Sequence, residues 1–214
     1  MNLDFSGEQL ALRDTVRDVF ERTFPAAALR ALWGGGEPDP KVWRALADVG
    51  VCGLLTAAGG GSEVDLAPVL EEAGRAAVVE PLVDTVAVAS SLLPDRAAKI
   101  AAGDLRVVIV SARMPFVANA DRAELLVHIA GDAARTIDPG DASLRPVVGV
   151  DRARRLFAVE IPEGAGELLV DDADAVDLAR ARGAAATANV LNGVGMRLLE
   201  MSVEHAKARE QFGR

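Results

Sequence analysis

The sequence contains a single cysteine, Cys52, and only two histidines, His128 and His205. A lone cysteine forms no intramolecular disulfide and cannot build a thiolate metal site. Because Cys52 lies in the apolar run 51–55, we expect a buried structural thiol rather than a nucleophile. The two histidines have neither HExxH nor paired-ligand spacing, so metal catalysis is not expected.

Long apolar runs and basic runs are also missing. No stretch approaches the ~20 apolar residues of a membrane-spanning helix, and the first residues do not resemble a signal peptide. The formal net charge is −9, which repels phosphate backbones and argues against nucleic-acid binding. We therefore expect a cytoplasmic protein that neither inserts into membranes nor binds nucleic acid.

The first hundred residues have the periodicity of helices. Ser6 and Gln9 are placed as a capping box, and apolar residues recur at helical spacing from there to Pro25. Further helices are predicted from Asp39–Pro40 to Gly50, from about Asp65 to Gly74 and from Glu80–Pro81 to Leu93, with a short one ending at Gly103.

At Leu105 the pattern changes to short β-branched runs. They predict strands over residues 107–110, 125–129, 145–150 and 156–161, and from about Ala175 the pattern is again helical. On that last helix one face carries small and apolar residues, expected to permit close helix contact: Ala184, Ala188, Leu191, Gly195, Leu198 and Ser202. The order predicts an α+β fold with a helical domain (1–104), a small β-domain (105–174) and the first helix of a bundle (175–214).

Three features have plain structural interpretations. The glycine runs 34–36 and 59–61 follow no strand and lack a Gly-Lys-Ser/Thr ending, so they are interpreted as connections between helices. The acidic stretch 167–177 matches no EF-hand spacing and is interpreted as a solvated loop with a helix N-cap. His205 stands alone on a helix, where a histidine is more often structural than catalytic.

The end of the chain is more informative. Arg209 can hold phosphate oxygens bidentately, the amide of Gln211 adds donors, and Phe212 offers a flat apolar surface. Gly213 can end the helix in a left-handed conformation. These residues together could grip a dinucleotide pyrophosphate, although physics alone favours an ordinary helix end.

The string Arg209-Glu210-Gln211-Phe212-Gly213 resembles the R-x-Q-F-G signature of the acyl-CoA dehydrogenase family. The resemblance extends along the chain. It includes the opening 3–9, the stretch 46–54 followed by the glycines 59–61, the segment 116–120 before a strand, and Gly193 sixteen residues before Arg209.

The resemblance implies an FAD-dependent dehydrogenase with a helical domain, a β-domain and a C-terminal four-helix bundle. Such an enzyme converts an acyl-CoA thioester, of a fatty acid or a steroid, to the enoyl-CoA and passes electrons to an acceptor protein. Arg209, Gln211 and Phe212 would contact the FAD of a neighbouring subunit. Arg182, or less well Arg180, lies near the family's substrate-side arginine.

Two departures from the family affect the expected activity. No carboxylate can be named as the catalytic base: the resemblance places it in the C-terminal bundle beyond Arg214 for most members, and the position that some relatives use instead is Gly183 here. Only residues 111–115 separate the first strand from Phe116, where the family has a longer flavin-binding segment. The chain is therefore expected to continue beyond Arg214 in the native protein, and residues 1–214 alone are expected to be inactive.

Three hypotheses remain open. The first is a dehydrogenase within a homo- or hetero-oligomer. The second is a non-catalytic partner subunit of a hetero-oligomeric dehydrogenase that contributes to a neighbour's FAD site. The third is a structural domain with neither ligand.

Overall fold

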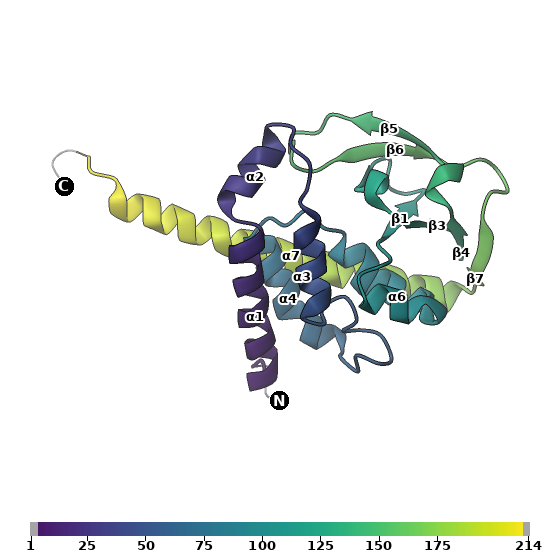
Figure 1. The fold of residues 1–214 in the computed structure, drawn as a ribbon, viewed down its shortest axis with the longest axis horizontal. Helices are drawn as coiled ribbons and strands as arrows, with labels where there is room; N and C mark the ends of the chain where they lie inside the picture. Colours follow the sequence, from purple (N-terminus) through teal and green to yellow (C-terminus); the bar gives the residue numbers. More distant parts are fainter. Residues whose placement is uncertain (1–3, 212–214) are drawn as a thin grey trace.

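The computed structural model describes residues 4–211 and has the predicted α+β architecture. The N-terminal part is helical, and Figure 1 shows its helices gathered beside one long C-terminal helix. Its elements are α1 (Gly7–Thr23), α2 (Ala26–Trp33), α3 (Pro40–Asp48), α4 (Glu63–Arg75), the π-helix η1 (Val83–Ala89), α5 (Ser90–Leu92), η2 (Pro94–Arg96) and α6 (Ala97–Ala101). The long helix is α7 (Ala173–Ala208).

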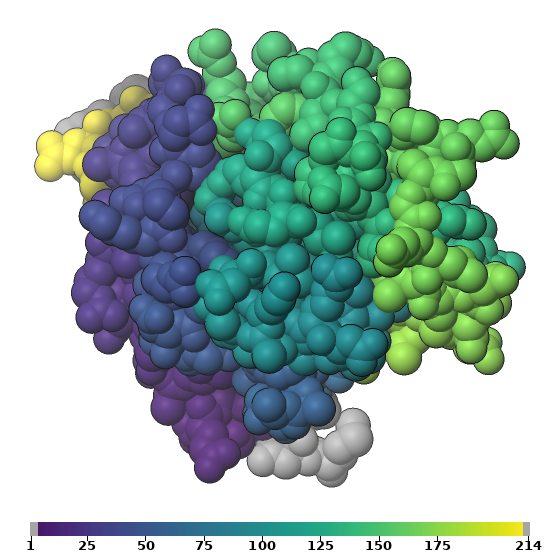
Figure 2. Space-filling model, turned by 45° about the vertical axis from the view of Figure 1, so that its right-hand side comes forward, coloured from purple at the N-terminus to yellow at the C-terminus, as the bar shows by residue number. Residues whose placement is uncertain are grey.

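The β part consists of two sheets with the orders β1-β3-β4-β7 and β2-β6-β5. β1 and β3 are parallel, and the other pairs are antiparallel. In Figure 2 this teal and green part packs directly against the purple and blue helices. The elements are β1 (Val107–Ser111), β2 (Val117–Ala118), η3 (Ala120–Arg122), β3 (Leu125–Ala130), β4 (Ala133–Ile137), η4 (Pro139–Asp141), β5 (Ser143–Val147), β6 (Leu156–Glu160) and β7 (Glu167–Asp171).

The predicted capping box at Ser6 is confirmed and reaches a second helix. Gln9 donates its backbone N–H to Ser6 Oγ and accepts from the Ser6 N–H, while its side-chain amide donates to Asp65 Oδ1 at 2.7 Å. Asp65 Oδ2 in turn accepts from the N–H and hydroxyl of Ser62. The N-termini of α1 and α4 are thus satisfied by one chain of hydrogen bonds.

The open edge of β1 is covered by side chains of η1. Thr85 Oγ1 donates to the Val107 carbonyl at 2.9 Å and accepts from the Val107 N–H at 3.0 Å. Asp84 Oδ2 accepts from the Ile109 N–H at 3.2 Å. These bonds replace a neighbouring strand, so the edge does not need another strand to satisfy its backbone groups.

α7 packs on α4 with their backbones in direct contact. A methyl group built on Gly193 would overlap the carbonyl of Glu71, and one built on Gly74 would overlap the carbonyl of Val190. Both glycines lie within helices, where alanine has the higher helix propensity. Glycine is therefore required at this crossing by the approach of the two helices.

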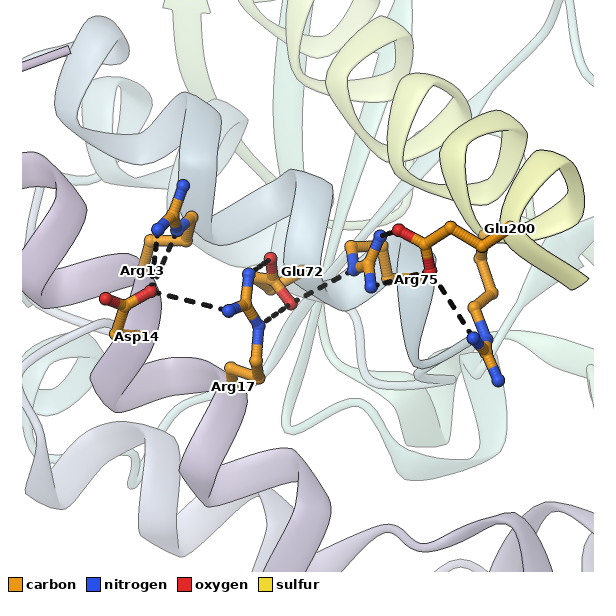
Figure 3. Close-up of polar contacts among 7 residues, drawn as sticks. Arg13, Asp14, Arg17, Glu72, Arg75 and Glu200 are labelled. Atoms are coloured by element: carbon orange, nitrogen blue, oxygen red, sulfur yellow. Dashed lines mark hydrogen bonds and ion pairs between the residues drawn. The ribbon is translucent and has the colours of Figure 1, made fainter. Parts of the chain in front are cut away.

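A row of charged side chains joins α1, α4 and α7 (Figure 3). The Glu72 carboxylate is almost fully buried and accepts from both Arg17 Nη2, at 2.6 Å, and Arg17 Nε. Arg75 approaches Glu72 at 3.5 Å and binds Glu200 of α7 with its two terminal nitrogens. Because Glu72 is paired from two sides, its burial is compensated.

A second polar cluster joins the helical and β parts. Glu80 is buried and pairs with Arg122 of η3 at 3.1 Å, and burial raises the pKa of Glu80. Asn119 has a left-handed backbone (φ 59°) and donates its side-chain amide to the Val79 carbonyl at 2.7 Å. These contacts fix the start of the second sheet on the end of the helical part.

The apolar core has three clusters. One lies among the helices and one between the two sheets. The third combines η1 and α5, the faces of β1 and β3, and Val176 and Ala179 of α7. Since this third cluster draws on all three predicted ranges, the division at residues 104 and 174 stays a prediction.

The structure corrects several details of the expected elements. α2 is a separate helix in a stretch for which no element was predicted, the helix predicted over 80–93 is largely the π-helix η1, and the strand predicted to residue 150 ends at Val147. The strands β2, β4 and β7 were not predicted, and β7 occupies the start of the stretch interpreted as an acidic loop. Asp172 does cap α7, as expected of that stretch.

The face of α7 expected to make close helix contacts is exposed in this structure, with Leu191 at 64% and Leu198 at 58%. α7 instead uses the opposite face, including Ala179, Ala186 and Gly193, against α4 and η1. Both faces are apolar or small, so the sequence pattern alone could not select between them.

Gly193→Ala should destabilise the protein by ~1–3 kcal/mol, because the added methyl group must push α4 and α7 apart. Gly195→Ala is the matched control, since its methyl group would meet nothing within 4 Å, and it should stabilise by ~0.5–1 kcal/mol. Urea unfolding measures both changes. Equal effects of the two substitutions would contradict the close helix contact.

Asp84 should make stability fall as the pH rises between about 4 and 6. Burial raises the pKa of Asp84 from 3.8 to about 6, so in this window the folded protein holds a proton that the unfolded chain has lost. Above pH 6 the loss is complete and is at most ~3 kcal/mol.

The measurement is urea unfolding at pH 5 and pH 7.5 for the wild type and for Asp84→Asn, which keeps an acceptor for Ile109. The variant should lose less stability between these two pH values. Part of the decline should persist, because the pKa of Glu80 is raised as well. Identical declines for both proteins would show that Asp84 does not titrate as described.

Candidate functional site

The proposed FAD contacts lie at the far end of α7, which extends away from the body of the molecule (Figure 1). The helix was expected to continue to Gly213, but it ends at Ala208, and Arg209 has an extended backbone whose N–H donates to the His205 carbonyl. Phe212 and Gly213 lie outside the described residues. Arg209 and Gln211 are exposed and have no side-chain partner among residues 4–211.

The donor set at this end suits a pyrophosphate. A guanidinium and a primary amide, neither of which has a partner among residues 4–211, can donate to phosphate oxygens without breaking a bond seen there. Arg209 lies 27 residues beyond Arg182 on one helix, a separation of about 40 Å at 1.5 Å per residue. These two arginines therefore cannot serve one site within a single chain.

The structure distinguishes the two candidate substrate-side arginines. Arg180 uses both terminal nitrogens internally, with Nη1 on Asp177 at 2.9 Å and Nη2 on the Gly131 carbonyl. Arg182 is bound through Nε alone, to Glu63 Oε1 at 2.6 Å. Of the two, Arg182 is the one whose terminal nitrogens make no hydrogen bond among residues 4–211.

Gly183 faces the π-helix η1. A methyl group built there would lie 3.1 Å from Val88 Cγ2, so little space exists for a longer side chain in this arrangement. A carboxylate base at this position would have to displace that valine. The structure therefore gives no support to a base on this part of α7.

A shallow hollow of about 270 Å³ lies at the carboxyl end of β1, where the family resemblance places the flavin ring. It is lined by Ser111, Met114, Pro115, His128 and by apolar residues of β2 and β6. Burial lowers the pKa of His128, so its ring is neutral at neutral pH. A second hollow, of about 470 Å³, adjoins Asp141, Ser143 and Glu160.

The residues present at the end of β1 do not fit a flavin ring. Ser111 Oγ accepts from the Arg113 N–H at 3.3 Å, and the Ser111 carbonyl accepts from the Met114 N–H at 2.9 Å. The short turn thus binds two of its own N–H groups internally, and no Arg, Lys, Asp or Glu side chain lines the hollow. The volume also lies below the ~300–1,000 Å³ of typical small-molecule sites.

Other site types find no support in the described part of the chain. Within residues 4–211 no group of three or more His, Cys, Asp or Glu side chains could hold a metal ion. No helix there is long and apolar enough to cross a membrane. Cys52 is fully buried, as expected of a structural thiol.

Sequence reasoning missed Glu63, the partner of Arg182. The two residues are 119 positions apart, and no local pattern marks the pair. The sequence marked Glu63 only as a carboxylate in the first turn of a helix. The helix dipole favours a carboxylate there whatever its partner, so this position does not point to Arg182.

With this fold and these residues, comparison with known proteins is informative. Residues 6–95 match the family model of the acyl-CoA dehydrogenase N-terminal domain. The chain is 33% identical over 219 residues to acyl-CoA dehydrogenase IpdE2 of Mycolicibacterium smegmatis, covering 98% of this chain and 68% of that protein. It is 32% identical to IpdE2 of Mycobacterium tuberculosis, covering 97% of this chain and 66% of that protein.

The solved structures agree in fold. The Tcur3481-Tcur3483 steroid ACAD G363A variant has a TM-score of 0.82 at 22% identity, covering 97% of this chain and 68% of that chain. The ChsE4-ChsE5 complex of Mycobacterium tuberculosis has a TM-score of 0.78 at 19% identity, covering 100% of this chain and 70% of that chain.

The fold, a helical part followed by a β part and one long helix, is thus that of a class of flavoprotein dehydrogenases. The chain belongs to the acyl-CoA dehydrogenase family. It spans about two thirds of the length of the curated relatives it matches.

Cys52 should be almost inert in the native protein. Burial raises the pKa of its thiol from 9.0 to about 12, with nearby Glu80 adding to the shift. The thiolate fraction near neutral pH is then about a thousandfold lower than for an unburied thiol. Labelling with a disulfide reagent at pH 8 should be slow before unfolding and complete in urea. Fast labelling of native protein would contradict the burial.

Proposed function

We propose that the chain takes part in FAD-dependent α,β-dehydrogenation of an acyl-CoA thioester within an oligomer. The observation that carries this proposal is that Arg209 and Gln211, just past the end of α7, are exposed and have no side-chain partner in the described part of the chain, which belongs to this family. Bound FAD would accept the hydride from the β carbon as the α proton is removed, leaving the enoyl-CoA. Electrons would then pass to an acceptor protein.

In this proposal the chain's own residues bind and orient. Arg209 and Gln211 donate to the pyrophosphate of FAD held by a neighbouring subunit, and Arg182 contacts the acyl-CoA. Phe212 remains a third proposed FAD contact. No residue is assigned as the base, because Gly183 offers no carboxylate. The acyl group could be fatty or steroid-derived, and the name of one structural relative includes a steroid ACAD.

A second candidate is a non-catalytic partner subunit of a hetero-oligomeric acyl-CoA dehydrogenase. This candidate is favoured by the hollow at the end of β1, which is small and whose adjoining turn binds the Arg113 N–H internally. The name of one structural relative, the ChsE4-ChsE5 complex, includes two different proteins. Such a subunit would hold no flavin ring in its own β part and would still lend Arg209 to its neighbour.

A visible absorption spectrum tests both candidates. The protein is purified as the assembly it forms in its own cells and is measured before and after anaerobic addition of mixed acyl-CoAs. A bleaching flavin band from assemblies of this chain alone supports the dehydrogenase. Flavin found only in complexes with a second family member supports the partner subunit, and no flavin in any assembly contradicts both.

The same assembly tests the role of Arg209. Arg209→Ala should weaken FAD binding about tenfold or more, because a charge-assisted contact is worth ~1.5–3 kcal/mol. Lys207→Ala, two residues earlier on the same exposed helix end, should leave flavin content unchanged. Equal flavin retention in both variants would remove Arg209 from the proposed site.

A further inference from the structure

The guanidinium of Arg182 is bound through its Nε atom. Its Nε donates to Glu63 Oε1 at 2.6 Å, across the gap between α7 and the start of α4. No further hydrogen bond of Arg182 is found among residues 4–211, and its side chain is 28% exposed. Nη1 and Nη2 therefore remain available, with the plane of the group oriented by Glu63.

Both ends of this contact are fixed by the fold. Arg182 lies between Ala179 and Ala186, which are buried under the helical part, so its backbone cannot shift without unpacking α7. Glu63 is the first residue of α4, and the pKa of its carboxyl is lowered by a backbone hydrogen bond at the helix start and by Arg182. The carboxylate is thus ionised and positioned at neutral pH.

Arg180 lacks this arrangement. Its Nη1 binds Asp177 and its Nη2 binds the Gly131 carbonyl, so each terminal nitrogen already has one of its two N–H donors bound within the chain. The two arginines lie two residues apart on one helix and differ in what their side chains can offer a ligand. This difference supplies an internal control.

We propose that Glu63 is a positioning residue that holds Arg182 through Nε and presents its two terminal nitrogens to a phosphate of the CoA thioester. The inference rests on the proposed function, which supplies the CoA thioester. A partly exposed ion pair such as this one contributes little to stability. We therefore expect the Glu63–Arg182 pair to act by orienting the guanidinium. A guanidinium whose plane is already oriented can bind a phosphate through both terminal nitrogens.

The test is calorimetric titration of CoA into the natural assembly and its variants, with no turnover needed. Glu63→Ala should weaken CoA binding about five- to tenfold, since the freed guanidinium must be ordered on binding. Glu63→Gln keeps an acceptor for Nε and should retain most of the affinity. Arg182→Lys should lose affinity to a similar extent, and adding Glu63→Ala to it should cause no further loss.

Two further measurements separate orientation from structure. Arg180→Lys should weaken CoA binding less than Arg182→Lys does, and dephospho-CoA identifies whether the 3′-phosphate is the group recognised. Wild-type affinity in Glu63→Ala, or additive losses in the double variant, would overturn the positioning role while leaving the proposed function intact. Absence of CoA binding by the wild type would instead overturn the proposed function and this inference with it.

Discussion

The backbone contact between α4 and α7 is the constraint on which the rest of the arrangement depends. Gly74 and Gly193 let the two helices approach until their carbonyls and α carbons meet. Side chains at these positions would separate the helices and weaken every contact that bridges them, including Arg75 with Glu200 and Arg182 with Glu63. Two small residues thus set the position of a helix of 36 residues.

This contact divides α7 into two parts with different surroundings. The first part is enclosed by α4 and η1, and its arginines are held by neighbouring side chains and carbonyls. The second part extends beyond α4, where Leu198, Leu199 and Arg209 are exposed. A rigid helix anchored at one end can carry donors well away from its own domain without disturbing that domain's core.

The sequence predicted those features that depend on near neighbours. The Ser6 and Asp39 caps, the β-branched runs at β1 and β3, and the start of the last helix follow from local side chains and were confirmed. α2 was missed because Pro25 and the glycines at 34–36 mark ends without showing that the residues between them form a helix. The pattern of β4, with alanine, arginine and threonine, has little of the apolar alternation that identifies a strand.

The candidate site was less predictable, for a physical reason. Whether an arginine is available to a ligand depends on partners far along the chain, such as Glu63 for Arg182 and Gly131 for Arg180. The family resemblance named both arginines and preferred Arg182, and the folded chain adds the difference in their partners. The same holds for α7, whose two apolar faces look alike until α4 covers one of them.

The end of β1 and the end of α7 lead to one interpretation of the molecule. The turn after β1 binds the Arg113 and Met114 N–H groups internally and leaves only a shallow hollow of about 270 Å³. The end of α7 does the opposite, since Arg209 and Gln211 have no partner within residues 4–211. A chain whose hydrogen-bond donors are bound internally at the end of β1 and exposed at the end of α7 is suited to completing a neighbour's cofactor site rather than building its own. In such an assembly the exposed Leu198 and Leu199, on the same part of α7 that leads to Arg209, would be covered by a neighbouring subunit, so helix packing and cofactor binding would be coupled.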